Sequence, residues 1–182
     1  MKLILILGLI LSQAPGGRQS AANSNRRWHA AIFRGMTVGK SKRADMLRLL
    51  GEPKWSRNTP GEDEEHGTTW NHYERIGEFP GLTNVANDSV TGTITRIEFY
   101  PDRLTKAQAV THFGRGYIVT RYAFEPCFKD EESEPIYESP NGPLVSVEYR
   151  ARGIAISIGH LDLVTRISYV DGPIGSVKSK CN

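Results

Sequence analysis

The sequence predicts an α+β protein in which two tandem helix-then-antiparallel-strands units form one sheet with helices on one face. A strand motif occurs twice: Ile94–Phe99 reads ITRIEF, and Val164–Tyr169 reads VTRISY with the same order of residue types. Each copy follows a short helical pattern that ends in glycine, at Gly51 and at Gly114. Short connections between the strands favour antiparallel pairing. Chance similarity between two strands is the alternative to a duplication.

The length and the net charge limit the size of the core and the kind of partner that the chain can have. A chain of 182 residues with 38% hydrophobic residues can bury one good core or two small cooperating cores. The formal net charge is +3, and basic clusters such as Lys40–Arg43 are offset by acidic ones such as Glu62–Glu65. A charge this weak and scattered argues against a nucleic-acid partner.

The N-terminus has the pattern of a secretory signal. Lys2 precedes the apolar run Leu3–Leu11, and cleavage is expected after Ala14 or, alternatively, after Ala22. The run is shorter than the roughly 20 residues that a membrane span needs, so we predict no transmembrane segment after cleavage. An uncleaved anchor is the alternative. Residues 1–22 are therefore assigned to the signal and the start of a leader, and residues 23–34 to the leader.

Residues 35–100 form the first predicted unit. Its helix begins at Ser41 as N-cap and ends at Gly51. Strands are expected at Thr68–Arg75 and Val90–Tyr100, with a turn-rich segment at Gly77–Ser89 between them.

Residues 101–170 form the second unit. Its helix begins with a capping box, in which Thr105 is followed three residues later by Gln108, and it ends at Gly114. The remaining expected segments are an extended stretch at Tyr117–Phe124 and three consecutive strands at Leu144–Arg150, Gly153–Gly159 and Leu163–Val170. Residues 171–182 are a C-terminal tail.

The chain has two cysteines, Cys127 and Cys181. In an exported protein an even number favours a disulfide, which here would tie the tail to a loop in the middle of the chain. Two free thiols are the alternative.

The alternation of side chains along the strands predicts one covered and one open face. Ile97 and Phe99 alternate with Arg96, Glu98 and Tyr100 in the first signature strand. Tyr, Trp and Arg are the residue types that dominate protein-binding surfaces. The alternative for the strand before it is that Trp70 is core and Asn71 is exposed. The residues predicted to form a binding surface on the open face are Trp70, His72, Glu74, Arg96, Glu98, Tyr100, Glu148, Arg150 and Arg166.

Part of the chain resembles known extracytoplasmic proteins. Gly35-Met36-Thr37, followed by the helix that ends Leu50-Gly51-Glu52-Pro53, is similar to the SmpA/OmlA outer-membrane assembly proteins, and the two-unit arrangement looks like the β-lactamase inhibitor protein fold. The second unit lacks the proline after its glycine, and no lipidation cysteine lies near the cleavage site. The resemblance implies a non-catalytic binding scaffold that uses the open sheet face.

Signals for an enzyme are poor. The five histidines do not have the spacing of zinc ligands, and neither a nucleophile elbow nor a phosphate-binding glycine loop is present, so we predict no metal and no cofactor. The leading hypothesis is an exported, non-catalytic scaffold of the bacterial cell envelope, periplasmic or extracellular, that binds a protein partner. The alternative is a small secreted hydrolase that uses His72 with Glu74 or Asp88.

Overall fold

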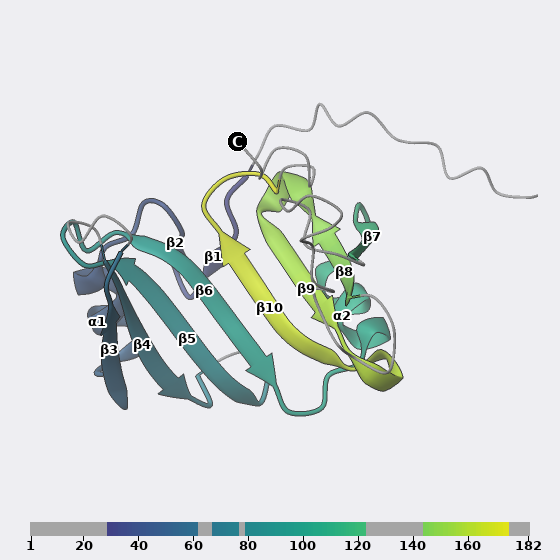
Figure 1. Ribbon diagram of the computed structural model, residues 1–182, viewed down its shortest axis with the longest axis horizontal. Helices are drawn as coiled ribbons and strands as arrows, with labels where there is room; N and C mark the ends of the chain where they lie inside the picture. Colours follow the sequence, from purple (N-terminus) through teal and green to yellow (C-terminus); the bar gives the residue numbers. More distant parts are fainter. Residues whose placement is uncertain (1–28, 62–66, 77–78, 123–143, 175–182) are drawn as a thin grey trace, which may run out of the picture.

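The computed structural model describes residues 29–61, 67–76, 79–122 and 144–174. The predicted signal, the first half of the leader at residues 23–28, and both Cys127 and Cys181 lie outside the described residues, so the disulfide stays a prediction. The described part is α+β, with one large antiparallel sheet, a small hairpin and two helices (Figure 1).

The elements alternate between short helices and runs of strands. The hairpin comes first, with β1 (Ile32–Phe33) and β2 (Met36–Thr37), and is followed by α1 (Arg43–Leu50), β3 (Trp55–Thr59), β4 (Thr68–Glu74), β5 (Gly81–Asp88) and β6 (Ile94–Pro101). The chain continues with α2 (Lys106–Phe113), β7 (Ile118–Tyr122), β8 (Leu144–Tyr149), the 3-10 turn η1 (Arg150–Arg152), β9 (Ile154–Ile158), η2 (His160–Asp162) and β10 (Val164–Val170).

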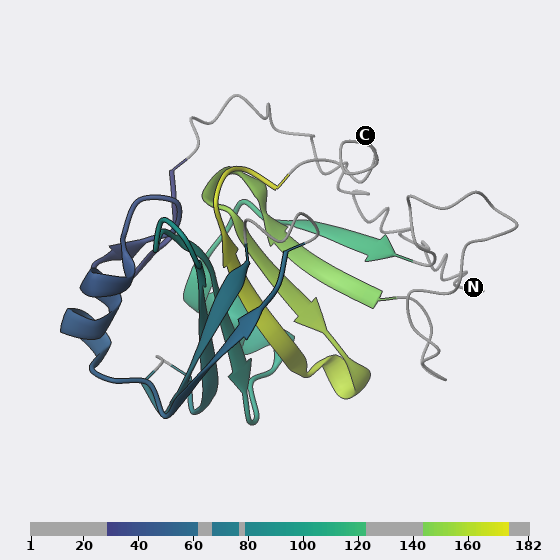
Figure 2. The ribbon, with the colours of Figure 1, turned by 60° about the vertical axis from the view of Figure 1, so that its left-hand side comes forward.

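The large sheet has the strand order β3-β4-β5-β6-β10-β9-β8-β7. One half of the sheet consists of β3–β6, which follow α1 in the chain, and the other half consists of β7–β10, which follow α2. The two halves meet where β6 pairs antiparallel with β10. Glu98 lies directly opposite Ser168 in this central pair. The sheet is strongly twisted, as two views show (Figures 1 and 2).

Both helices lie behind the sheet in Figure 1, and the core fills the space between them and the sheet. Met46 of α1 and Phe113 of α2 belong to the same buried cluster as Ile97 and Ile167 from the two central strands. Phe33 of the hairpin packs edge-on against Phe99, with ring centroids 4.9 Å apart. The folded part thus begins before residue 35, which corrects the predicted end of the leader at residue 34, because Phe33 contributes to the core.

A tyrosine joins the sheet to the end of each helix. Tyr73 of β4 donates its hydroxyl hydrogen to the carbonyl of Gly51 at 3.1 Å, and Tyr149 of β8 donates to the carbonyl of Gly114 at 2.9 Å. These carbonyls belong to the C-cap glycines of α1 and α2, where helix ends leave backbone acceptors without partners in the helix. Each helix is therefore attached to the sheet through its C-terminal glycine.

The residue before each helix N-cap accepts a backbone hydrogen bond from a central strand, which is β6 for α1 and β10 for α2. The backbone amide of Ile94 donates to the carbonyl of Ser41 at 2.8 Å, and that of Val164 donates to Leu104 at 2.7 Å. Thr105 caps α2 with the predicted capping box, which the structure confirms. The N-cap of α1 is Lys42 rather than the predicted Ser41, and its backbone amide donates to the carboxylate of Asp45 at 3.0 Å.

Two strands depart from the sequence prediction. The segment predicted as turn-rich contains β5, which lies between β4 and β6 in the sheet. Strand β3 was not predicted, and all five of its residues are exposed, because it lies at the edge of the sheet.

Irregular pairing near the start of β6 and β10 changes which side chains enter the core. The register shifts between Ala86 and Asn87 opposite β6, and between Val164 and Arg166 in β10. As a result Ile94 and Val164 are buried, although strict alternation assigns both to the same face as Arg96 and Arg166.

Candidate functional site

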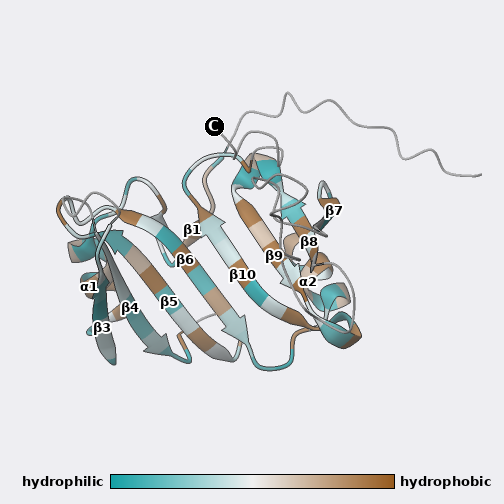
Figure 3. Cartoon of the chain, in the orientation of Figure 1, coloured by the Kyte–Doolittle hydropathy of each residue, from teal (hydrophilic) through white to brown (hydrophobic). Residues whose placement is uncertain are grey.

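The candidate site is the open face, defined as the side of the large sheet opposite α1 and α2, which is the side seen in Figure 3. Side chains that are directly paired across antiparallel strands share a face. The pairing therefore arranges the open face in rows that cross the strands. The central row contains Trp55, His72, Asn84, Glu98, Ser168, Ala155, Glu148 and Ile118.

A further row of paired side chains runs on each side of the central row. One contains Arg57, Trp70, Ala86, Arg96 and Val170. The other contains Glu74, Leu82 and Tyr100 in the first half of the sheet, and Arg166, Ser157, Ser146 and Thr120 in the second. The inner part of the central row is buried, since Glu98 is 4% and Glu148 2% exposed, whereas Trp55 and Ile118 at its two ends are exposed.

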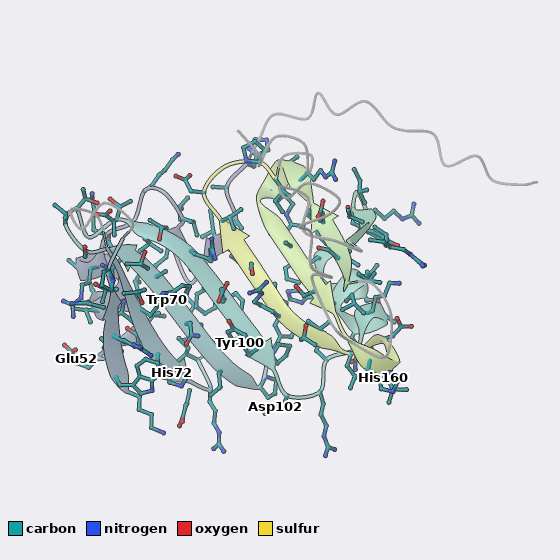
Figure 4. All side chains as sticks on the ribbon, viewed as in Figure 1. Glu52, Trp70, His72, Tyr100, Asp102 and His160 are labelled. Atoms are coloured by element: carbon teal, nitrogen blue, oxygen red, sulfur yellow. The ribbon has the colours of Figure 1, made fainter. Side chains whose placement is uncertain are left out.

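Trp70 lies on the open face and is partly exposed, whereas Asn71 points to the other side and is fully buried. The Asn71 amide donates to the carbonyl of Val85 at 3.0 Å and to Asn87 Oδ1 at 2.8 Å. These bonds satisfy a polar side chain inside the protein. The alternative reading, with Trp70 in the core and Asn71 exposed, is wrong. Figure 4 shows Trp70, His72 and Tyr100 over the strands of the first half.

Glu98 is a buried carboxylate at the centre of the open face. The Tyr100 hydroxyl donates to Glu98 Oε2 at 2.6 Å. Arg96 Nη1 and Arg166 Nη1 each lie 3.7 Å from Glu98 Oε1. Burial, with the hydrogen bond to Glu98 second, raises the pKa of Tyr100 above its usual value. A buried carboxylate requires such compensation by positive charges and hydrogen bonds.

Glu148 is held in a similar way in the second half of the sheet. Arg150 Nε donates to Glu148 Oε2 at 2.9 Å, and Arg150 Nη2 donates to Thr120 Oγ1 at 3.4 Å. Arg150 stands in the 3-10 turn that follows β8 rather than in the strand, and its side chain folds back onto the strand.

His72 makes contacts that hold its ring in place. Its ring stacks on Trp55 with centroids 4.6 Å apart and 10° between the planes. His72 Nδ1 donates to Asn84 Oδ1 at 2.8 Å, because a carboxamide oxygen can only accept. Glu74 pairs with Lys54 Nζ at 2.5 Å, and this hydrogen bond is the main cause that lowers the pKa of Glu74.

The three residues of the alternative hydrolase, His72, Glu74 and Asp88, make hydrogen bonds to different partners. Asp88 accepts hydrogen bonds from the backbone amides of Val90 at 3.1 Å and Thr91 at 2.6 Å, so its carboxylate holds the turn before β6. The imidazole of His72 donates a hydrogen bond to the side-chain amide oxygen of Asn84, and Glu74 pairs with Lys54. This arrangement gives the hydrolase hypothesis no positive support.

Within the described ranges, no three His, Cys, Asp or Glu side chains come together as a metal site. In the same part of the chain, no helix is both long and apolar enough to cross a membrane.

The nine residues predicted for the open face all come from β4, β6, β8, η1 and β10, and the register brings their strands together on this face. They form no single cluster, because Glu148 and Arg150 lie two strands away from β10. Sequence reasoning missed Trp55, Arg57 and Leu82, which stand on β3 and β5. The spacing of Trp55 and Arg57, two residues apart, is the one signal that could have placed both on one face of a strand.

The sequence matches no protein-family model. No curated protein matches it either. Among solved structures, the fold is similar to the crystal structure of a DUF4309 family protein (YjgB) from Bacillus subtilis subsp. subtilis str. 168, with 14% sequence identity and a TM-score of 0.45. The similarity covers 76% of this chain and 84% of that chain. The proposal of a binding surface therefore depends on the open face alone.

Proposed function

We propose that the protein is an exported, non-catalytic scaffold that binds a protein partner through the open face. The observation that carries the proposal is the combination of aromatic and arginine side chains exposed there. Trp55 is 47% exposed and stands beside Arg57 and Trp70, while Arg96, Arg166 and Tyr100 surround the carboxylate of Glu98. Trp, Tyr and Arg contribute most of the binding energy in protein interfaces.

The surface is also suited to a partner because its acidic groups are already engaged. Glu98 and Glu148 are buried against arginines, and Glu74 pairs with Lys54. The charges left exposed are therefore mainly those of the arginines, and a partner with an acidic contact surface would complement them.

We further propose that the two halves of the sheet are copies of one helix-then-strands unit, with both helices on one face. The support comes from contacts that recur at equivalent places. Tyr73 and Tyr149 bind the C-terminal glycine of each helix, and Ile94 and Val164 bind the residue before each N-cap. Chance similarity of the ITRIEF and VTRISY strands does not require these contacts to match as well.

The export and the family relationship are proposals that rest on the sequence. The signal pattern at Lys2–Leu11 supports transport to the periplasm or the cell exterior. The motif around Gly35 and Gly51 and the tandem arrangement support a relationship to the SmpA/OmlA proteins and to the β-lactamase inhibitor protein fold.

Site-specific photo-crosslinking in the envelope of the native host tests the binding surface. Arg57 or Leu82 on the open face is replaced by a photo-crosslinking amino acid, and Arg48, on the exposed side of α1, is replaced in the control. We expect one partner to be crosslinked from positions 57 and 82 and not from position 48. The crosslinked protein is then identified by mass spectrometry and purified.

The purified partner allows a direct measurement of binding. Because Trp70 is partly exposed, Trp70→Ala should weaken the partner's binding by at least about tenfold and leave the melting temperature nearly unchanged. Arg48→Ala should bind as tightly as the wild type. Crosslinks from position 48 alone, or unchanged binding by Trp70→Ala, would contradict the proposal.

A further inference from the structure

The centre of the open face lies where β6 meets β10, and it holds more positive than negative charge. Arg96 and Arg166 are the third residues of the ITRIEF and VTRISY strands, and both face the carboxylate of Glu98. The equivalent position of the second strand holds Ser168, which pairs directly with Glu98. Two guanidinium groups thus share one carboxylate.

Most hydrogen-bond donors of this arginine pair are unused by Glu98. Both arginines lie 3.7 Å from Glu98 Oε1, which is longer than a hydrogen bond, so their interaction with it is electrostatic. The strong hydrogen bond to Glu98 comes from Tyr100 at 2.6 Å. Arg166 Nε is buried and has no hydrogen-bond partner. An arginine has five N–H donors in a planar fork that matches a carboxylate.

We propose that Arg96 and Arg166 form a subsite for one carboxylate, supplied by an aspartate or glutamate side chain of the protein partner. This inference rests on the proposed function and specifies its chemistry. The side chains of Arg96 and Arg166 are 49% and 40% exposed, so an incoming group can reach both guanidinium groups.

The charge balance selects a carboxylate over a phosphate. Glu98 and one incoming carboxylate together match the two arginines, whereas a dianionic phosphate would leave an excess of negative charge beside a buried glutamate. Tyr100 and Trp70 stand on the same face and can contact the apolar part of a protein surface. An acidic side chain within a protein interface satisfies both requirements.

The test uses an array of short capped peptides in matched sets. Each set has one sequence and varies only at a central residue, which is Asp, Glu, Asn or Gln. We expect wild-type protein to prefer the acidic member of the sets it binds by about tenfold, since a charge-assisted hydrogen bond is lost in the amide. The double variant Arg96→Gln with Arg166→Gln should lose this preference, and Arg48→Gln should keep it.

A second variant fills the subsite from within the chain. In Ser168→Glu the new carboxylate stands beside Glu98 and between the two arginines, so it should compete with the peptide and abolish the acidic preference while both arginines remain. Ser168→Gln is the matched control and should retain the preference. Circular dichroism and the melting temperature establish that each variant is folded.

Several results would overturn the inference. One is equal binding of acidic and amide peptides by the wild type, and another is an acidic preference that survives in Ser168→Glu or in the double variant. Vesicles of phosphatidylglycerol are tested against vesicles of phosphatidylcholine. Binding to the anionic vesicles that depends on both arginines, without a preference among peptides, would assign the pair to a membrane surface instead.

The two proposals can fail separately. If the crosslinked partner binds through Trp70 but is unaffected by Ser168→Glu, the partner surface stands and the carboxylate subsite is wrong. If crosslinks form only from the control position 48, the proposed function itself is wrong.

Discussion

In the half of the sheet that contains β3–β6, Tyr73 holds the end of α1, and in the half that contains β7–β10, Tyr149 holds the end of α2. On the core side the same tyrosine-to-glycine contact thus occurs in both halves. On the open face they differ, since the first half carries Trp55 and Trp70 while β8 and β9 carry Ser146, Ala155 and Ser157. Contacts that maintain the fold recur in both halves, and the side chains suited to binding gather in one half and at the junction.

Truncating the two central isoleucines should have the largest effect and should affect both halves alike. Ile97 and Ile167 are fully buried in one core, so Ile97→Ala and Ile167→Ala should each lower the free energy of unfolding by about 3 kcal/mol. Urea denaturation measures both. Ile118→Ala, at a position that is 50% exposed, is the control and should change stability by less than about 0.5 kcal/mol. If Ile97→Ala and Ile167→Ala lower the free energy of unfolding by very different amounts, the two halves do not contribute equally to the core.

Removing the tyrosine hydroxyls tests the helix attachments. Tyr73→Phe and Tyr149→Phe should each cost about 1 kcal/mol, because each loses one hydrogen bond to a helix-terminal carbonyl. Denaturation of the two variants and of the double variant should give additive losses, since the residues lie in different halves. No loss in one variant would show that its helix is held in another way.

The stability that Tyr73 contributes should depend on pH in the alkaline range. Burial, with the charge of Glu52 second, raises the pKa of Tyr73 to about 12 from its usual 10.0. The unfolded state therefore loses this proton first as the pH rises, so the stability contributed by Tyr73 is complete below pH 10 and is lost between about 10 and 12. The difference in unfolding free energy between wild type and Tyr73→Phe should shrink over that range. A constant difference would contradict the shift.

Substitutions at the N-caps of the two helices should have small effects that differ between the halves. Thr105→Ala removes a side-chain cap that accepts from the amide of Gln108 at 3.2 Å, and it should cost about 1 kcal/mol. Lys42→Ala keeps the cap at α1, which Asp45 makes to the backbone of residue 42, and removes only exposed hydrogen bonds from Lys42 Nζ to Thr91 and Thr93, so it should cost only about 0.5 kcal/mol. Thr105→Ser keeps the hydroxyl and serves as the control. Equal losses at both positions would contradict this assignment.

Elements with a strong local signal were predictable from the sequence. The capping box at Thr105 marked the start of α2, and the alternation in Ile154–Ile158 marked a strand with one buried face, as the structure confirms. The predicted faces of β6 and β10 also hold from Arg96 and Arg166 onward. They fail at Ile94 and Val164, because an irregular register is a property of two paired strands and is invisible in one of them.

Strand β5 could not be recognised because its polar residues look like turn residues. Asn84 and Asn87 accept hydrogen bonds at 2.8 Å from His72 and Asn71 of the neighbouring strand, so their side chains are satisfied within the sheet. Strand β3 gives no apolar alternation, since all its residues are exposed. The site residues on these strands, Trp55 and Leu82 among them, were missed together with the strands.

The pairing of β6 with β10 has a consequence for each half taken alone. A fragment that contained only α1 and β3–β6 would expose the whole length of β6 as an unprotected edge, which invites pairing with another chain. Two such fragments could satisfy each other by placing their β6 strands antiparallel. An isolated half is therefore expected to exist as a homodimer that mimics the full-length monomer.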